Sequence, residues 1–416
     1  MLKGASLLYV TVISLIIAII SSSLILFSYY KQQERDLYAH EQKVCQNVMS
    51  GIHLLLTNES AEQNTGKFID LYGAGTDTVF LKNLNWGIFH IAGCIAFSHG
   101  KEVRKVALTG YGEGRKDTAA LYLVDAGVPL SLCGETFLRG CCYLPQTGVK
   151  RGYIDGKNFN GNQLINGQIK QSSKSIPDIS KALLSQLDLL AGNRTAKDDS
   201  VINVLKDTLI NSFFNKTMEV HFHKGLVLNA GSKYVGNILI ISDTLVEIKA
   251  GCAIQDIIIC APVVSIDDGF NGSVQVFASD SLHVGINCKL NYPSVLGLIS
   301  GKVTVNKLVT LTVDKGSSVC GTLVAYSKMP STQVQVCTLI SKNDTINGAV
   351  FTNGAIDLEG VVYGNITCDK LTLKTQSSQY DNYLMDATID ITKRSKYFIG
   401  SIADSGAQKS IVKWLE

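Results

Sequence analysis

The fold prediction for this chain starts from residues 245–256, LVEIKAGCAIQD. Val246 and Ile248 alternate with polar residues, as in a strand that buries one face. Gly251 interrupts the alternation before Ile254 resumes it, and glycine readily adopts the backbone angles of a tight turn. The stretch therefore predicts a short strand followed by a corner.

The same pattern returns along the chain. Gly231, Gly251 and Gly269 stand 20 and 18 residues apart, each after two apolar residues that alternate with other residues. A period near 20 with corner glycines predicts a solenoid, in which each coil is too small to bury its own apolar face and must stack on its neighbours. The copies are Leu226-x-Leu228, Val246-x-Ile248, Val264-x-Ile266, Leu311-x-Val313, a degenerate Leu282-x-Val284 and a shorter Ile356-x-Leu358.

Composition limits the class of protein. The chain has 416 residues, enough for two or three domains, and 46% of them are hydrophobic. Only 18% are charged, against about 25% in an average soluble domain. The formal net charge is +3 without a block of lysine and arginine, so we expect no nucleic-acid partner.

Cysteine usage points to packing more than to chemistry. None of the eleven cysteines forms a C-x-x-C pair of the kind that binds zinc. We expect most of them to be free and buried, with disulfides as the alternative. Cys141 and Cys142 are adjacent, so on a strand only one of them can face the core.

The N-terminal segment is expected to cross a membrane. No charged residue occurs from Gly4 to Tyr30, which exceeds the roughly 20 residues that a spanning helix needs and the apolar region of a signal peptide. Apolar residues continue at helical spacing beyond it, so one helix from about Ser6 to Leu56, roughly 75 Å long, is predicted. The segment is interpreted as a retained single-pass anchor.

This N-terminus resembles type IV pilins and the minor pilins of type II secretion over about 50 residues. The resemblance rests on the sequence Lys3-Gly4-Ala5-Ser6-Leu7 ahead of a single apolar helix that continues into the body. It implies an accessory of a pilus-like system. Tyr9 stands where those pilins carry a glutamate, and an ordinary signal anchor is the alternative.

The side of the membrane that holds the residues after the apolar segment, here called the body, is inferred from their composition. Lys3 lies on one side of the apolar segment, whereas Lys31, Arg35 and Lys43 lie on the other, which leaves the charge rule undecided. A charge-poor surface rich in Asn, Ser and Thr favours a body outside the cytoplasm, while the number of cysteines favours the opposite. We expect a single-pass protein of the bacterial inner membrane with an extracytoplasmic body.

The pattern divides the chain into six parts. Antiparallel strands should follow a polar linker, and the coils should be interrupted by a helical hairpin with one apolar stripe over 183–190 and another over 201–213. A final apolar run with Trp414 is expected to pack against the end of the solenoid. The parts are 1–56, transmembrane and extended helix; 57–119, linker and β-meander; 120–175, first β-helix-like coils; 176–215, helical hairpin; 216–375, β-helix; and 376–416, C-terminal cap.

A second resemblance covers the repeat from Gly225 to Gly364. Its corner glycines and the copies Gly236-Asn237-Ile238 and Gly364-Asn365-Ile366 resemble the repeats of bactofilins and other polymer-forming bacterial proteins. This implies a single-stranded parallel β-helix filled by the apolar repeat residues. The predicted fold class is therefore mainly β, with an N-terminal transmembrane helix, a meander, a solenoid and an inserted helical hairpin.

The candidates for chemistry are few. His221 and His223 should share one face of a strand, but no third metal ligand is evident in the sequence. Asp267 and Asp268 precede a corner and are expected to be turn residues rather than the carboxylate pair of a glycan-cleaving enzyme. The glycine-rich stretch from Gly110 to Thr118 lacks the phosphate-loop spacing, and no G-x-S-x-G motif occurs.

These observations predict a protein that is not an enzyme, with no catalytic, cofactor-binding or metal-binding residue and no cofactor. The expected role is structural: a membrane-anchored scaffold of the bacterial cell envelope that self-associates or partners envelope proteins. The alternatives are an anchored module that binds a glycan or the cell wall and, less favoured, a β-helix enzyme that acts on polysaccharides.

Overall fold

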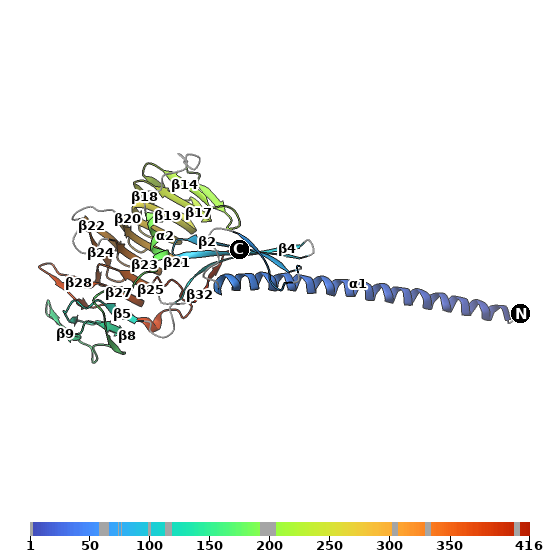
Figure 1. Cartoon of the computed structure of the whole chain (residues 1–416), viewed down its shortest axis with the longest axis horizontal. Coiled ribbons are helices and arrows are strands. Elements are labelled where there is room, and N and C mark those ends of the chain that lie inside the picture. The colour runs from blue at the N-terminus through green and yellow to red at the C-terminus, as the bar shows by residue number, and fades with distance from the viewer. Residues whose placement is uncertain are drawn as a thin grey trace. The chain divides into compact units, whose positions relative to one another are not determined.

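The computed structural model describes residues 3–57, 66–73, 75, 77–98, 101–112, 119–191, 205–301, 307–328, 334–402 and 408–416. Strands make up 53% of the chain and one long apolar helix occupies its N-terminus, which confirms the mainly β class (Figure 1). The chain divides into two compact units. Unit 1 comprises residues 1–58, 65–82 and 93–105, and unit 2 holds the remainder.

Unit 1 is built on α1 (Lys3–Thr57), a single helix of 55 residues. The predicted long helix is confirmed. Its last turns bury Val44, Val48, Ile52 and Leu55, which lie on one face because helical neighbours recur every three or four residues. The strands that contribute to unit 1 are β1 (Lys67–Asp70) and parts of β2 (Thr78–Trp86), β3 (Phe89–Ser98) and β4 (Lys101–Tyr111).

Close packing of α1 on these strands depends on Gly51. A Cβ atom at this position would lie 2.4 Å from the Cys94 sulfur and 2.9 Å from a methyl carbon of Leu81, so only glycine lets the helix approach the sheet this closely. Two polar contacts stabilise the same region. The buried Asp77 accepts a hydrogen bond from Asn47 at 2.9 Å and forms an ion pair with Lys43 at 2.8 Å. Strand β1, which pairs antiparallel with β2, lies in the first part of the segment 57–119, where a polar linker is expected ahead of the strands.

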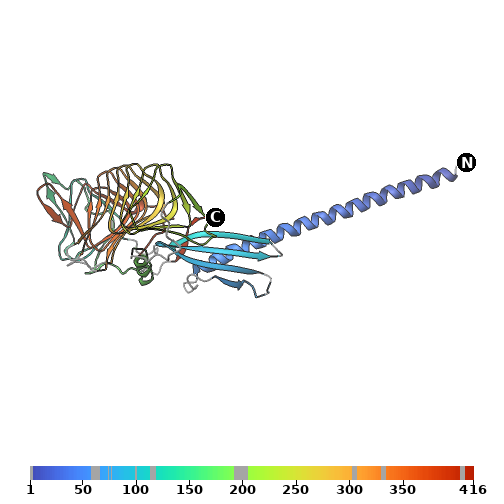
Figure 2. The same ribbon diagram turned by 90° about the horizontal axis from the view of Figure 1, so that it is seen from above.

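Unit 2 is dominated by strands that pair in parallel with strands one repeat further along the chain (Figure 2). We call this set the parallel stack. From residue 208 onwards its strands are β13 (Thr208–Asn211), β14 (Met218–Phe222), β15 (Leu226–Leu228), β16 (Lys233–Gly236), β17 (Ile238–Ser242), β18 (Leu245–Ile248), β19 (Ala253–Ile266), β20 (Asn271–Val284), β21 (Lys289–Ser300), β22 (Lys307–Val313), β23 (Ser318–Ser327), β24 (Val334–Ile340), β25 (Thr345–Thr352), β26 (Ala355–Leu358), β27 (Val361–Cys368), β28 (Lys370–Lys374) and β31 (Thr388–Asp390).

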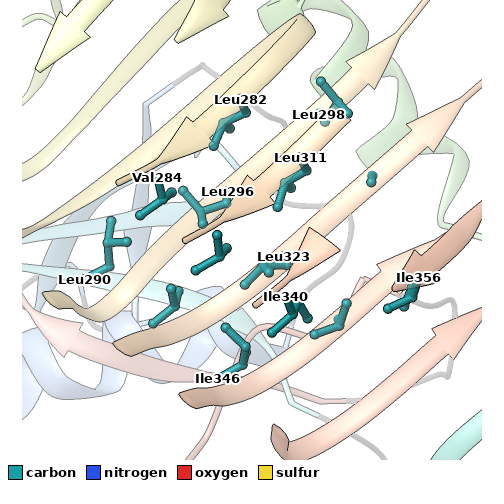
Figure 3. Packing of buried hydrophobic residues seen from close by; sticks show 14 of the residues in the cluster. Leu282, Val284, Leu290, Leu296, Leu298, Leu311, Leu323, Ile340, Ile346 and Ile356 are labelled. Atoms are coloured by element: carbon teal, nitrogen blue, oxygen red, sulfur yellow. The ribbon is translucent and has the colours of Figure 1, made fainter. Parts of the chain in front are cut away.

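The apolar repeat residues form columns inside the stack (Figure 3). Val246 lies opposite Val264, which lies opposite Leu282, and the same register continues to Leu311 and Ile356 through Thr338. Every Φ-x-Φ copy that the sequence analysis identified thus falls into two neighbouring columns. The copy Thr338-x-Ile340 was missed because its first position holds a threonine, whose hydroxyl is buried without a hydrogen-bond partner among the described residues.

Strands that precede residue 175 in sequence extend the stack at its other end. Strand β5 (Ala119–Leu123) pairs in parallel with β27, and β8 (Cys141–Leu144) pairs with β5. The segment 120–175, expected to supply the first coils, therefore follows β27 in the stack rather than preceding β13. The remaining strands of this segment are β6 (Leu130–Cys133), β7 (Phe137–Arg139), β9 (Val149–Arg151), β10 (Tyr153–Ile154), β11 (Lys157–Asn158) and β12 (Ile169–Gln171). Later in the chain, β29 (Gln379–Asp381) pairs antiparallel with β28, and β30 (Tyr383–Met385) pairs in parallel with β6.

The outer side of the stack carries a second apolar layer. In β17 all five residues are buried, because Ile238 and Ile240 face the interior while Leu239 and Ile241 face outward into another cluster. Helix α2 (Lys181–Ala191) contacts β19, β20 and β21 and adds Leu187 and Leu190 to that outer cluster. A strand that is buried on both faces reads as a continuous apolar run.

The expected second helix of the hairpin is wrong. Residues 192–204 lie outside the described residues, and Thr208–Asn211 forms β13, which pairs in parallel with Lys233–Gly236. Leu205 and Leu209 have a helical spacing of four, yet both pack against the interior cluster of the stack. Pairing with a neighbouring strand has overridden the local helical pattern.

The last described strand pairs with β4, and Glu416 beyond it reaches the segment that follows β13. Strand β32 (Lys409–Trp414) pairs antiparallel with β4, and Trp414 remains 41% exposed. Val412 and Leu415 of the same apolar run are partly buried against the outer cluster. The carboxylate of Glu416 accepts hydrogen bonds from Ser212 and Phe213 at 2.6 and 2.9 Å. A short 3-10 helix, Ile391–Lys393, precedes this segment.

A ladder of glycines runs across the stack. Gly321, Gly348 and Gly364 occupy equivalent register positions in β23, β25 and β27. A Cβ atom on Gly348 would lie 1.8 Å from the backbone oxygen of Gly321. The ladder leaves room for the ring of Phe398, which comes within 2.8 Å of the same Cβ position.

We predict that Gly348→Ala destabilises the protein by about 1–3 kcal/mol, because the obstructing atom is backbone and the added methyl group cannot be accommodated without moving a strand. The matched control is Gly225→Ala, where the nearest atom lies 3.8 Å from the added carbon. Denaturant unfolding of the full chain in detergent, followed by tryptophan fluorescence, measures both variants. Equal midpoints for the two variants would contradict the ladder.

Candidate functional site

The structure brings a carboxylate to the two histidines that the sequence placed on one strand face. His221 lies on β14 with its side chain outward, because the adjacent Val220 is paired with the interior residue Ile240. His223 follows the end of the strand. Asp243 follows the end of β17, the strand that pairs in parallel with β14. The three side chains therefore meet at the same corner of two successive strands.

Both oxygens of Asp243 are engaged by imidazole nitrogens. Nε2 of His221 lies 2.6 Å from Oδ1, and Nδ1 of His223 lies 2.7 Å from Oδ2. The two rings are 5.2 Å apart between centroids. Burial differs strongly, since the side chain of His221 is 4% exposed while those of His223 and Asp243 are 62% and 38% exposed.

The electrostatics favour an ionised carboxylate. The hydrogen bond from His223, followed by that from His221, holds the pKa of Asp243 below its usual range against the opposing effect of partial burial. Two imidazoles and one carboxylate are ligand types that zinc accepts. Among the described residues, the side chains of these three form a cluster in which one ligand atom of each lies within 4.8 Å of the others.

The structure therefore supplies a third potential ligand, Asp243, that was not evident in the sequence. Asp243 stands 20 residues after His223, which is the spacing of the repeat. A search one period away from each histidine would have found it. The residues adjacent to His221 and His223 in sequence do not include Asp243, because parallel pairing of β14 with β17 brings this residue to them.

A second histidine–carboxylate pair provides a comparison. His283 on β20 lies 2.8 Å from Asp314, which follows β22, the strand paired with β20. The construction is the same, a histidine near the end of one strand and a carboxylate after the end of its parallel neighbour. It contains one histidine instead of two and offers fewer ligands.

The other candidates behave as corner residues. Asp267 pairs with Lys249 at 3.3 Å, and Asp268 accepts a hydrogen bond from the backbone of Ile286 at 2.7 Å. Both follow the end of β19 and lie in a turn, which confirms their predicted role. Ser317 is buried and donates to the backbone oxygen of Gly285 at 2.8 Å, so it too supports a corner.

The glycine-rich stretch 110–118 is only partly described. Gly110 belongs to β4 and pairs with Ser410 of β32, whereas residues 113–118 lie outside the described residues. Tyr122 and Tyr143 form an outward pair on adjacent strands, with their rings stacked at 5.5 Å. Lys170 lies over the ring of Tyr143.

The cysteines are free, and eight of the eleven are buried. Cys142 lies in the interior cluster while Cys141 is partly exposed, as the alternation along a strand predicted. Burial raises the pKa of the Cys142 thiol to about 12, so the thiolate form is suppressed at neutral pH.

Asp357 is a buried carboxyl group that the sequence analysis did not single out. It lies on β26 between the interior residues Ile356 and Leu358, so it faces outward, yet it is only 6% exposed. Its Oδ1 atom has no hydrogen-bond partner among the described residues. Burial, assisted by the nearby Glu359 and opposed by Lys374, raises the pKa of Asp357 to about 6.

The exposed surface of α1 is the other candidate site. Its apolar residues from Leu7 to Tyr30 are exposed, and the helix is long and apolar enough to cross a membrane. None of its most apolar window is buried in the protein, unlike the core helix of a globular domain.

Comparison of the chain with protein-family models, with curated proteins and with solved structures gave no match.

Ionisation of Asp357 is predicted to weaken the fold as pH rises. A carboxyl group whose pKa is raised on folding stabilises the native state below its unfolded pKa, and this contribution is lost as pH rises through about 6. We expect Asp357→Asn to match the wild type near pH 4 and to exceed its unfolding free energy by about 2–3 kcal/mol at pH 7.

The measurement is denaturant unfolding of the full chain at several pH values. Asp381→Asn, at a side chain that is 56% exposed, serves as the exposed control. Parallel pH curves for Asp357→Asn and wild type would exclude a buried, destabilising carboxylate.

Proposed function

We propose that this chain is a non-catalytic, membrane-anchored scaffold protein of the bacterial cell envelope, an accessory subunit of a pilus-like assembly. The observation that carries the proposal is the construction of α1. One unbroken helix has an exposed stretch without charge from Gly4 to Tyr30, and its last turns, from Val44 onwards, pack on the strands of unit 1.

This construction gives α1 two different environments. The stretch from Gly4 to Tyr30 is free of charge, so its exposed apolar side chains require lipid or other helices around them. Around Gly51 the same helix is held by close packing and by the Asp77 contacts. This arrangement fixes the strands of unit 1 to the same helix that would enter the membrane, as a membrane-anchored scaffold requires.

We further propose that the parallel stack is a single-stranded β-helix. Support comes from the continuous register that links Ile240, Ile259 and Val276 and then runs on, through further strands, to Leu121 and Cys142. Repeats that contact only their neighbours form elongated, stiff bodies with large lateral faces. Such faces suit a structural role in the envelope, with the body outside the cytoplasm.

Self-association through α1 is the first form of assembly to test. The full chain is reconstituted into phospholipid vesicles, cross-linked at lysine residues and imaged by negative-stain electron microscopy. Filaments or ordered arrays with cross-linked multimers support a self-assembling scaffold. Isolated particles with no cross-linked species above the monomer would overturn self-assembly.

Ile17→Arg is the matched variant for the anchor, because Ile17 is 58% exposed within the uncharged stretch. An arginine at the centre of a spanning helix costs about 2.5–3.5 kcal/mol on insertion. We predict that this variant loses alkali-resistant membrane association and multimers together. Tyr38→Arg, at an exposed position beyond the apolar stretch, should retain both. Retention of Ile17→Arg in the membrane would contradict the anchor.

A further inference from the structure

We propose that His221, His223 and Asp243 form a binding site for one Zn²⁺ ion, which ties together two successive strands of the parallel stack. The site is independent of the assembly proposed above, because all three residues lie in unit 2 and none belongs to α1. The ligands are Nε2 of His221, Nδ1 of His223 and the carboxylate of Asp243.

The backbone places these groups without any special loop. His221 and His223 are two residues apart, and side chains two apart along an extended chain point to the same side. The parallel register pairs Phe222 with Ser242, so Asp243 arrives beside His223. The carboxylate therefore faces the same side as both imidazoles, and its two oxygens are directed at their nitrogens.

His221 is buried although its ring carries two polar nitrogens. Its residue is 3% exposed, and its Nδ1 atom is buried without a hydrogen-bond partner among the described residues. The paired position on β17 holds Ile241, which packs in the outer apolar cluster. An aliphatic side chain at 221 would avoid the desolvation of an unpaired ring nitrogen. The other ring nitrogen, Nε2, faces Asp243 at 2.6 Å and is the atom of this buried ring that is placed to bind a metal.

The spacing of the ligand atoms suits a small transition-metal ion. Zinc lies about 2.0–2.2 Å from histidine nitrogen and carboxylate oxygen, in tetrahedral geometry. The three ligand atoms already lie within 4.8 Å of one another. Because the His223 side chain is 62% exposed, it has the freedom to rotate by the small amount that admits the ion. Mg²⁺ and Ca²⁺ prefer sites made of oxygen ligands.

Three protein ligands leave one position of a tetrahedral zinc ion open. Exposure of His223 and Asp243 directs that position towards solvent, so water or a ligand from another molecule completes the coordination. Bound zinc joins the residues that follow β14 and β17, and it stabilises the native state by mass action because the unfolded chain does not hold the three ligands together.

The test uses the full chain in detergent after treatment with a chelator. Cys45 is exposed, so all proteins carry Cys45→Ser to remove a competing thiol. Isothermal titration with zinc chloride should give one ion per chain, magnesium chloride should give no binding, and zinc should raise the melting temperature.

His223→Ala is the informative variant, because this side chain is exposed and its removal leaves the packing of His221 in place. We expect it to weaken zinc binding by at least about tenfold and to abolish the rise in melting temperature. His283→Ala is the matched control, since it removes a histidine from a similar pair with Asp314 and should bind zinc as the parent does.

Equal zinc affinity for His223→Ala and the parent would overturn the site, as would the absence of saturable binding at one ion per chain. Asp243→Asn supplies a second reading, because it keeps the size of the side chain while removing the charge. If Asp243→Asn melts as the parent does without zinc and still binds the ion with unchanged affinity, the carboxylate is not a ligand and the proposal fails.

Discussion

Each strand of the parallel stack depends on its neighbours to bury the side chains that it points inward. The interior columns consist of Val, Ile, Leu and occasional Cys residues that are almost fully buried. A strand of three to five residues cannot cover such a row by itself, whereas stacking at the separation of paired strands removes it from water on both sides. The rest of unit 2 thus depends on the burial of apolar side chains between successive repeats.

Other features follow from this stacking. Gly321, Gly348 and Gly364 stand at the same register position in successive strands, so the strand backbones approach each other closely there. The ring of Phe398 lies beside Gly348. Outward apolar residues such as Phe277 would be exposed on a bare stack, yet they share the outer cluster with α2 and with Trp86. The helix and the neighbouring strands therefore protect one side of the stack from water.

Regular register also creates the polar sites. A side chain at the end of one strand meets the residue one repeat later, so His223 meets Asp243 and His283 meets Asp314. Neither pair depends on sequence proximity. The repeat that packs the interior with apolar columns thus generates clusters of titratable groups at its corners, and a second histidine two residues away turns one such pair into a ligand set.

Much of the architecture follows from local pattern. Alternation of apolar residues, corner glycines and a spacing near 20 predicted the Φ-x-Φ strands and their inward faces, and the uncharged stretch predicted one long helix. These features are readable because they depend on the period of the side chains along the backbone. The adjacent Cys141 and Cys142 were resolved by the same argument.

Tertiary structure alone decided the order of the stack and the third member of the histidine cluster. Leu121 pairs with Ile366, far away in sequence, because strand edges are chosen by the complementarity of whole repeats. Thr208–Asn211 became a strand although Leu205 and Leu209 have helical spacing, since its backbone pairs in parallel with β16. Asp243 joined His221 and His223 for the same reason: parallel pairing brings together residues that local sequence patterns keep apart.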